Sequence, residues 1–117
     1  MPNPRPRSPL QVQRGRRVGP PSLPKLAADL PPVVYFVRTS DDLIKIGYTA
    51  SLRDRRRSLG VKWDDVLAIV PGTLADEQAA HALFAEYLAR GREYFHPAPA
   101  LVEHINIIRG RLGVASV

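Results

Sequence analysis

The fold is decided by two short apolar runs, VYFV at residues 34–37 and KIGYT at residues 45–49. Both runs are rich in β-branched and aromatic side chains, and the polar segment TSDD at residues 39–42 is typical of a turn. This spacing predicts an antiparallel hairpin with strands at Val33–Arg38 and Leu43–Ile46. Because glycine reaches backbone conformations closed to other residues, we interpret Gly47 as the point where the chain leaves the sheet.

A helix is predicted directly after the hairpin. It begins near Thr49 or Ser51, because Ser51 with Asp54 three residues later is a capping pair, and it ends at Gly60. The apolar run 66–70, which a Pro-Gly pair follows, then predicts a third, buried strand.

Two further helices complete the predicted order of elements. Thr73 with Asp76 begins the first, which runs to Gly91 with the apolar positions Ala80, Leu83, Phe84, Tyr87 and Leu88 at helical spacing. The second runs from about Pro99 to Leu112 and directs Leu101, Ile105, Ile108 and Leu112 inward. Residues 33–112 are therefore expected to form one small α/β (α+β) domain.

Residues 1–32 differ sharply from the rest of the chain. They contain nine of the twelve prolines and six basic side chains against one acid, so they carry +5 of the formal net charge of +6. Proline blocks helix and sheet hydrogen bonds, and the apolar residues show no sustained period, so we expect a disordered basic tail. Such a tail favours a nucleic-acid partner through phosphate neutralisation, although an inert extension is the alternative.

Composition excludes several classes of protein. The chain has no cysteine, which rules out disulfides and cysteine-ligated zinc. No apolar run is long enough for a membrane span or a signal peptide, so we expect a cytoplasmic protein without a membrane partner. We also expect no small-molecule cofactor, and the sequence leaves the oligomeric state open.

Several short motifs occur in the chain, and their order and spacing are more specific than any single motif. They are Tyr35 in the first run, Lys45-Ile46-Gly47, Thr49, Leu52, Arg55, Glu77 with His81, and the segment GREYF at residues 91–95. In this order the chain resembles the GIY-YIG nuclease superfamily, in the short branch common in phage and bacterial genomes whose second signature is Lys-Ile-Gly. The resemblance implies a small three-stranded, partly antiparallel sheet flanked by helices.

The resemblance also implies roles for individual residues. Tyr35 matches the tyrosine beside the attacking water and the metal, Arg55 the arginine that holds the scissile phosphate, and Glu77 the carboxylate that binds one divalent cation. Lys45 takes the place of the second signature tyrosine, where a cation can hold a phosphate oxygen but is a poor base. Tyr48, one residue after the glycine, is a spatial substitute for that tyrosine by hypothesis.

The chemistry of phosphodiester hydrolysis fits these residue types. Negative charge spreads over the phosphoryl oxygens, so the site needs fixed positive charge and an activated water. Arg55 and one hydrated Mg²⁺ (or Mn²⁺) supply that charge, and Mg²⁺ is content with one or two protein carboxylates, as Glu77 would provide. A glutamate in the first turn of a helix can instead serve only to complement the helix dipole.

Other charged residues have open alternatives. His81, one turn after Glu77, can belong to the metal's outer shell, orient Glu77, shuttle a proton, or be a boundary histidine with satisfied hydrogen bonds. Arg53, Arg56 and Arg57 are interpreted as a solvated, DNA-binding face. Glu93 is either a second acidic group or a partner of a neighbouring arginine.

Three functional classes compete. The first is a metal-dependent endonuclease acting on DNA, favoured by Tyr35, Arg55 and Glu77 together. The second is a catalytically weak or inactive nucleic-acid-binding module of the same fold, favoured by Lys45 at the second signature. The third is an RNA-binding accessory protein, indicated only by the arginine-rich tail.

Overall fold

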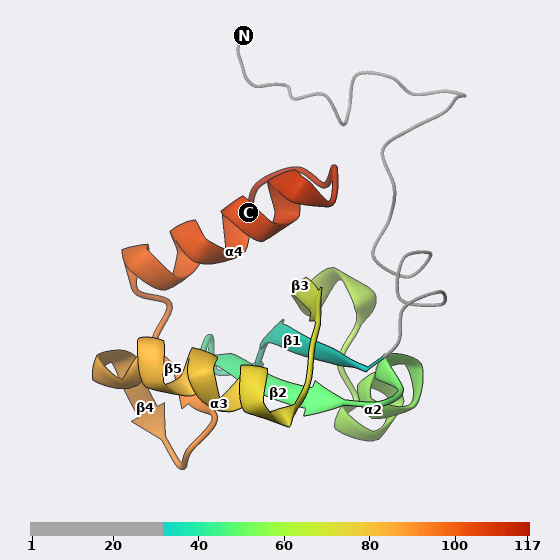
Figure 1. The fold of residues 1–117 in the computed structure, drawn as a ribbon, viewed down its shortest axis with the longest axis horizontal. Coiled ribbons are helices and arrows are strands. Elements are labelled where there is room, and N and C mark those ends of the chain that lie inside the picture. Colours follow the sequence, from blue (N-terminus) through green and yellow to red (C-terminus); the bar gives the residue numbers. More distant parts are fainter. Residues whose placement is uncertain (1–31) are drawn as a thin grey trace, which may run out of the picture.

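The computed structural model of the chain describes residues 32–117. The predicted tail, residues 1–32, lies outside the described residues except for Pro32, whose carbonyl accepts a hydrogen bond from the Gly72 amide. The described part forms an α+β fold in which helices pack on one antiparallel sheet (Figure 1).

Within residues 32–117 the sheet has five strands, and every strand pair in it is antiparallel. Their order across the sheet is β3-β1-β2-β5-β4, with bounds β1 Val33–Arg38, β2 Ile44–Thr49, β3 Val66–Pro71, β4 Leu88–Arg90 and β5 Tyr94–Phe95. The prediction of three strands, partly antiparallel, was therefore incomplete. The two extra strands form a short hairpin that pairs with the first residues of β2, at Ile44 and Lys45.

The helices lie close to where their capping signals placed them, at α2 Leu52–Leu59, α3 Leu74–Leu83 and α4 Pro99–Arg111. Ser51 caps α2 by accepting from the Asp54 amide, and Gly60 ends the helix with a φ of 70°. Thr73 and Asp76 form the predicted capping box of α3.

The end of α3 differs from the prediction. The helix stops at Leu83 rather than Gly91, because Phe84 turns into the core and residues 85–87 form a short 3-10 turn that leads into β4. Leu83 and Leu88, two of the apolar positions at helical spacing, are 63% and 43% exposed. Gly91, with a φ of 59°, instead forms the turn between β4 and β5.

Each face of the sheet has its own apolar cluster. One combines alternate residues of β1 and β2 with Phe84, Phe95 and the inward face of α4 at Leu101, Ile105 and Ile108, as predicted for that helix. The other contains Tyr35 and packs against Leu52 of α2. Figure 1 shows α2 beyond the C-terminal end of β2 and the β4–β5 hairpin at its other end.

Candidate active site around the Tyr35 phenol

The side chain of Tyr35 crosses the neighbouring strand at Gly47. The two residues are direct partners in the β1–β2 register, and Tyr35 is 1% exposed. A Cβ atom added to Gly47 would lie 2.3 Å from the Tyr35 hydroxyl oxygen and 2.4 Å from its Cζ. Gly47 was predicted to be the point where the chain leaves the sheet, and this prediction was wrong. Gly47 lies inside β2 and leaves the space that the Tyr35 phenol fills.

Charges from three separate parts of the chain act on this phenol. Burial raises the pKa of Tyr35 to about 12; Arg55 of α2 lowers it, whereas Glu93, Glu77 of α3 and Tyr94 raise it further. The hydroxyl is consequently protonated at neutral pH, so in this state it donates a hydrogen bond and does not act as a base. Two residues on which the nuclease hypothesis depends, Arg55 and Glu77, therefore both influence the pKa of the third, Tyr35.

Arg55 extends from the exposed side of α2. Its position follows from the Ser51 cap, since the Arg55 amide donates to the Ser51 carbonyl in the first turn of the helix. With Tyr48 and Ser58 it lines a shallow hollow of about 520 Å³ at the C-terminal end of β2. An exposed guanidinium beside a hollow is accessible to a phosphate group from solvent.

Glu77 is half-buried in the first turn of α3. The capping function in that turn already belongs to Asp76, whose carboxylate accepts from the Thr73 amide at 2.7 Å. Among residues 32–117 no group of three or more histidine, aspartate and glutamate side chains is arranged to hold a metal. A cation at Glu77 would therefore take its other ligands from water and substrate oxygens, which is the coordination that Mg²⁺ accepts.

Lys45 lies on the same face of the sheet as Tyr35, because alternate residues of a strand point the same way. It is buried, its Nζ is 3.0 Å from Glu93 Oε1, and it lies 4.9 Å from the centre of the Tyr94 ring. The Ile46 amide donates to the Glu93 carbonyl at 2.9 Å, which anchors that segment to β2. Glu93 thus pairs with Lys45 and not with the neighbouring arginines considered from the sequence.

His81 connects α3 to β2. Its Nε2 is 2.8 Å from the Ile46 carbonyl oxygen, and its ring lies 5.5 Å from that of Phe95. A carbonyl oxygen can only accept, so Nε2 carries the hydrogen in this contact. Of the alternatives drawn from the sequence, this contact is the one expected of a boundary histidine.

Because side chains alternate between the two faces of a strand, Tyr48 is not placed beside the Tyr35 phenol. It is the partner of Val34 in the register, and so it projects from the face opposite to Lys45 and Gly47. Its substitution for the missing second tyrosine therefore has no support from the register.

The basic run of α2 divides into two kinds of residue. Arg53 and Arg57 are exposed, as expected of a DNA-binding face. Arg56 is half-buried; its Nη1 donates to the Val61 carbonyl at 2.8 Å, and its guanidinium lies 4.9 Å from the Trp63 ring centre. Its predicted exposure was wrong, because Arg56 holds the loop that follows the helix.

The β4–β5 hairpin adds residues that sequence reasoning did not assign to the site. Arg90 Nη1 lies 2.6 Å from Asp41 Oδ2, and its guanidinium lies 4.6 Å from the Tyr94 ring centre. The pKa of the Asp41 carboxyl is lowered by its hydrogen bonds from Thr39 and Arg90. The segment GREYF at residues 91–95 indicated in the sequence that this part of the chain belongs to the motif. Only the pairing of β5 with β2 shows that the segment lies beside Lys45.

Among residues 32–117, no helix combines the length and the apolar character that crossing a membrane requires. Comparisons of the chain with protein-family models, with curated proteins and with solved structures found no match in any of the three.

Proposed function

We propose that the chain is a metal-dependent endonuclease of the GIY-YIG type that hydrolyses DNA phosphodiester bonds. The observation that supports this most is the convergence on one phenol. Tyr35 of β1, Arg55 of α2 and Glu77 of α3 are distant in sequence, yet both charged groups act on the Tyr35 hydroxyl. A carboxylate, a guanidinium and a hydroxyl that influence one another electrostatically are suited to the negative charge of a phosphodiester and to the metal that its hydrolysis requires.

In this proposal each side chain has a separate task. Arg55 donates two hydrogen bonds to non-bridging oxygens of the scissile phosphate, which its planar fork allows. Glu77 holds Mg²⁺ or Mn²⁺, which when bound supplies positive charge to the phosphate and a more acidic water. The protonated Tyr35 hydroxyl donates to the attacking water or to a phosphate oxygen and so fixes its position. The water oxygen bonds to phosphorus and the bond to the leaving deoxyribose oxygen breaks. The proton that the attacking water loses passes to solvent, and solvent returns a proton to the leaving oxygen, so that the step balances.

A second candidate is a binding module of the same fold with weak or no catalysis. The observation in its favour is the Lys45–Glu93 ion pair, which stands where the GIY-YIG pattern has a second tyrosine. A cation at this place still attracts a phosphate, but it does not readily accept a proton. Both candidates predict DNA binding, so only cleavage separates them.

The deciding experiment incubates the full chain with supercoiled plasmid, with Mg²⁺, with Mn²⁺ and with a chelator. We expect metal-dependent nicking that Glu77→Ala abolishes, with DNA binding retained. Glu103→Ala is the matched control, because Glu103 is exposed on α4 and no role is proposed for it. Glu77→Ala nicking within about threefold of wild type, an effect too small for a lost metal ligand, contradicts the metal assignment.

A result without cleavage has a defined meaning. Wild-type protein that binds DNA but leaves it intact with either metal supports the binding module. Binding to an RNA that is stronger than binding to DNA of the same sequence, without cleavage of either, would place the protein in the third class considered from the sequence. Folding of Glu77→Ala is checked by its melting temperature, since a first-turn glutamate contributes at most about 1 kcal/mol to stability.

A further inference from the structure

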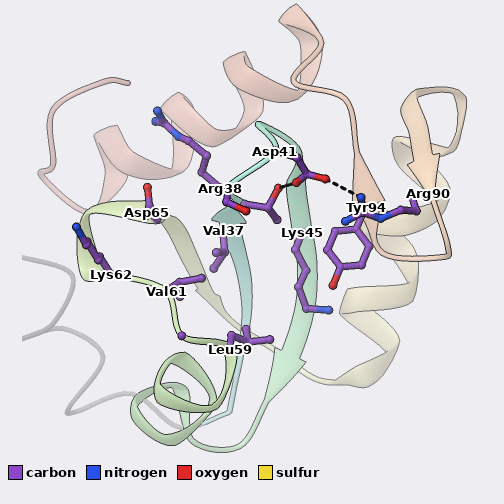
Figure 2. Close-up of a pocket in the computed structure, with 13 residues that line it drawn as sticks. Val37, Arg38, Asp41, Lys45, Leu59, Val61, Lys62, Asp65, Arg90 and Tyr94 are labelled. Atoms are coloured by element: carbon purple, nitrogen blue, oxygen red, sulfur yellow. Dashed lines mark hydrogen bonds and ion pairs between the residues drawn. The ribbon is translucent and has the colours of Figure 1, made fainter.

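A cavity of about 450 Å³ lies next to the candidate active site (Figure 2). It opens between the β1–β2 turn, the loop after α2 and the β4–β5 hairpin. Val37, Leu59 and Val61 supply apolar lining, and charged side chains surround it. Lys45 lines this cavity and is the one proposed catalytic residue that does so.

The charges around the cavity are unequal. Among the residues that the structure describes, four basic residues line the cavity, against the two acids Asp41 and Asp65; the basic residues are Arg38, Lys45, Lys62 and Arg90. Arg90 is paired with Asp41, and Lys45 with Glu93, whereas Arg38 and Lys62 are exposed. An apolar lining with a positive rim fits a flat ring joined to a phosphate, which is the chemistry of a nucleotide.

One wall of the cavity presents stacking groups. Lys45 and Arg90 both lie over the ring of Tyr94, and all three residues line the cavity; Figure 2 shows the Tyr94 ring between the Lys45 and Arg90 side chains. A base that enters would meet the Tyr94 ring and the Arg90 guanidinium plane. Both are groups on which proteins stack unpaired bases.

The cavity lies at a suitable distance from the Tyr35 phenol. Val37 is two residues from Tyr35 along β1 and faces the same side, which corresponds to about 7 Å at the usual strand rise. Stacked nucleotides rise about 3.4 Å each along a strand. The cavity is therefore within one or two nucleotides of a phosphate held at Tyr35.

We propose that this cavity binds one unpaired base of a DNA strand, one or two nucleotides from the phosphate at Tyr35. The path of the strand rests on the proposed function, but the binding of the base itself requires no cleavage. A base in an intact duplex must be unstacked before it can enter, so the cavity favours single-stranded or locally unpaired DNA.

The test is a titration of the full, isotope-labelled chain in the presence of a chelator, followed by NMR and by affinity measurement. The probe is a short single-stranded oligothymidylate, compared with an abasic strand of equal length. We expect the amide signals of Val37, Val61 and Tyr94 to shift with the oligothymidylate only. Loss of the base should weaken binding about fivefold or more, the equivalent of one stacked base.

Two charge reversals provide matched variants. Lys62→Glu changes an exposed residue that lines the cavity, and Arg111→Glu changes an exposed residue of α4 that does not. We expect the former to weaken oligothymidylate binding several times more than the latter. Equal effects of the two variants, equal affinity for the abasic strand, or unshifted signals at the cavity would each overturn the proposal. Tighter binding of oligouridylate would overturn it in favour of an RNA base.

The outcomes also separate this inference from the proposed function. Base-dependent shifts at the cavity without plasmid cleavage would remove the nuclease and leave the base site. Metal-dependent cleavage without base-dependent shifts would do the reverse.

Discussion

Replacement of Gly47 by alanine should damage both stability and catalysis, because the added methyl group enters the space of the Tyr35 phenol. The new Cβ would lie 2.3 Å from the hydroxyl oxygen, whereas ordinary contacts begin at 3.4 Å, so the ring must move by about 1 Å. Overpacking of this kind costs about 1–3 kcal/mol. For a domain of this size each kcal/mol lowers the melting temperature by about 4–8 °C.

The catalytic effect should be similar in free energy to the effect on stability, because a loss of rate of about 10²-fold corresponds to about 2.7 kcal/mol. A displacement of about 1 Å can reduce a rate by about 10² when the displaced group positions a reactant. Melting temperature and plasmid nicking, both measured on the full chain, test the two parts of the prediction.

Two matched variants make the Gly47→Ala prediction refutable. Gly110→Ala lies in α4, where nothing is within 4 Å of the added Cβ, and should leave stability unchanged or slightly raised. In a Tyr35→Leu background the ring is absent, so the further change at Gly47 should cost little, a coupling that a double-mutant cycle measures. Gly47→Ala with the melting temperature and nicking rate of wild type would show that the ring does not occupy this space.

Three other predictions follow from the same site. Arg55→Ala should lower the cleavage rate by about 10²–10³, and Arg55→Lys should restore little of that rate. Arg57→Ala should mainly weaken DNA binding. Equal losses of cleavage rate in Arg55→Ala and Arg57→Ala would show that the arginines of α2 act only as a DNA-binding face. Because the pKa of Tyr35 is raised to about 12, its stabilising contribution is complete below pH 10 and is lost between about pH 10 and 12, at about 1.4 kcal/mol per pH unit. Denaturant unfolding at rising pH should show a smaller loss in Tyr35→Phe. Glu93→Gln should destabilise the fold by about 1–2 kcal/mol, because it leaves Lys45 buried without a carboxylate partner. The double variant with Lys45→Met should recover most of that stability. No recovery in the double variant would show that Lys45 and Glu93 are not energetically coupled.

Local signals predicted the parts of the fold that depend on neighbours in sequence. The β1–β2 hairpin, the Ser51 and Thr73 caps and the start of α4 at Pro99 were all recognised, because alternation, capping and proline geometry act over a few residues. The β4–β5 hairpin was missed for the opposite reason. Its strands have three and two residues, too few to show a period, and β5 is held by backbone pairing with both β4 and the edge of β2.

The site could be predicted only in part for the same physical reason. The resemblance to the GIY-YIG pattern pointed to Tyr35, Arg55 and Glu77, and in the folded chain Arg55 and Glu77 both influence the pKa of Tyr35. The pairing of Lys45 with Glu93 joins residues 48 positions apart, and no local pattern contains it. The function of Gly47 likewise required the strand register, since only the register places the Tyr35 ring over it.

The contrast between a fully buried Tyr35 and an exposed Arg55 has a thermodynamic consequence for substrate binding. The ring is immobilised when the chain folds, so its conformational entropy is lost before any substrate arrives. The arginine retains its rotamers in the free protein, and fixing them on a phosphate costs up to about 2 kcal/mol. If the proposed function holds, the Tyr35 hydroxyl is preorganised for substrate, and the entropic penalty of binding a phosphate falls mainly on Arg55.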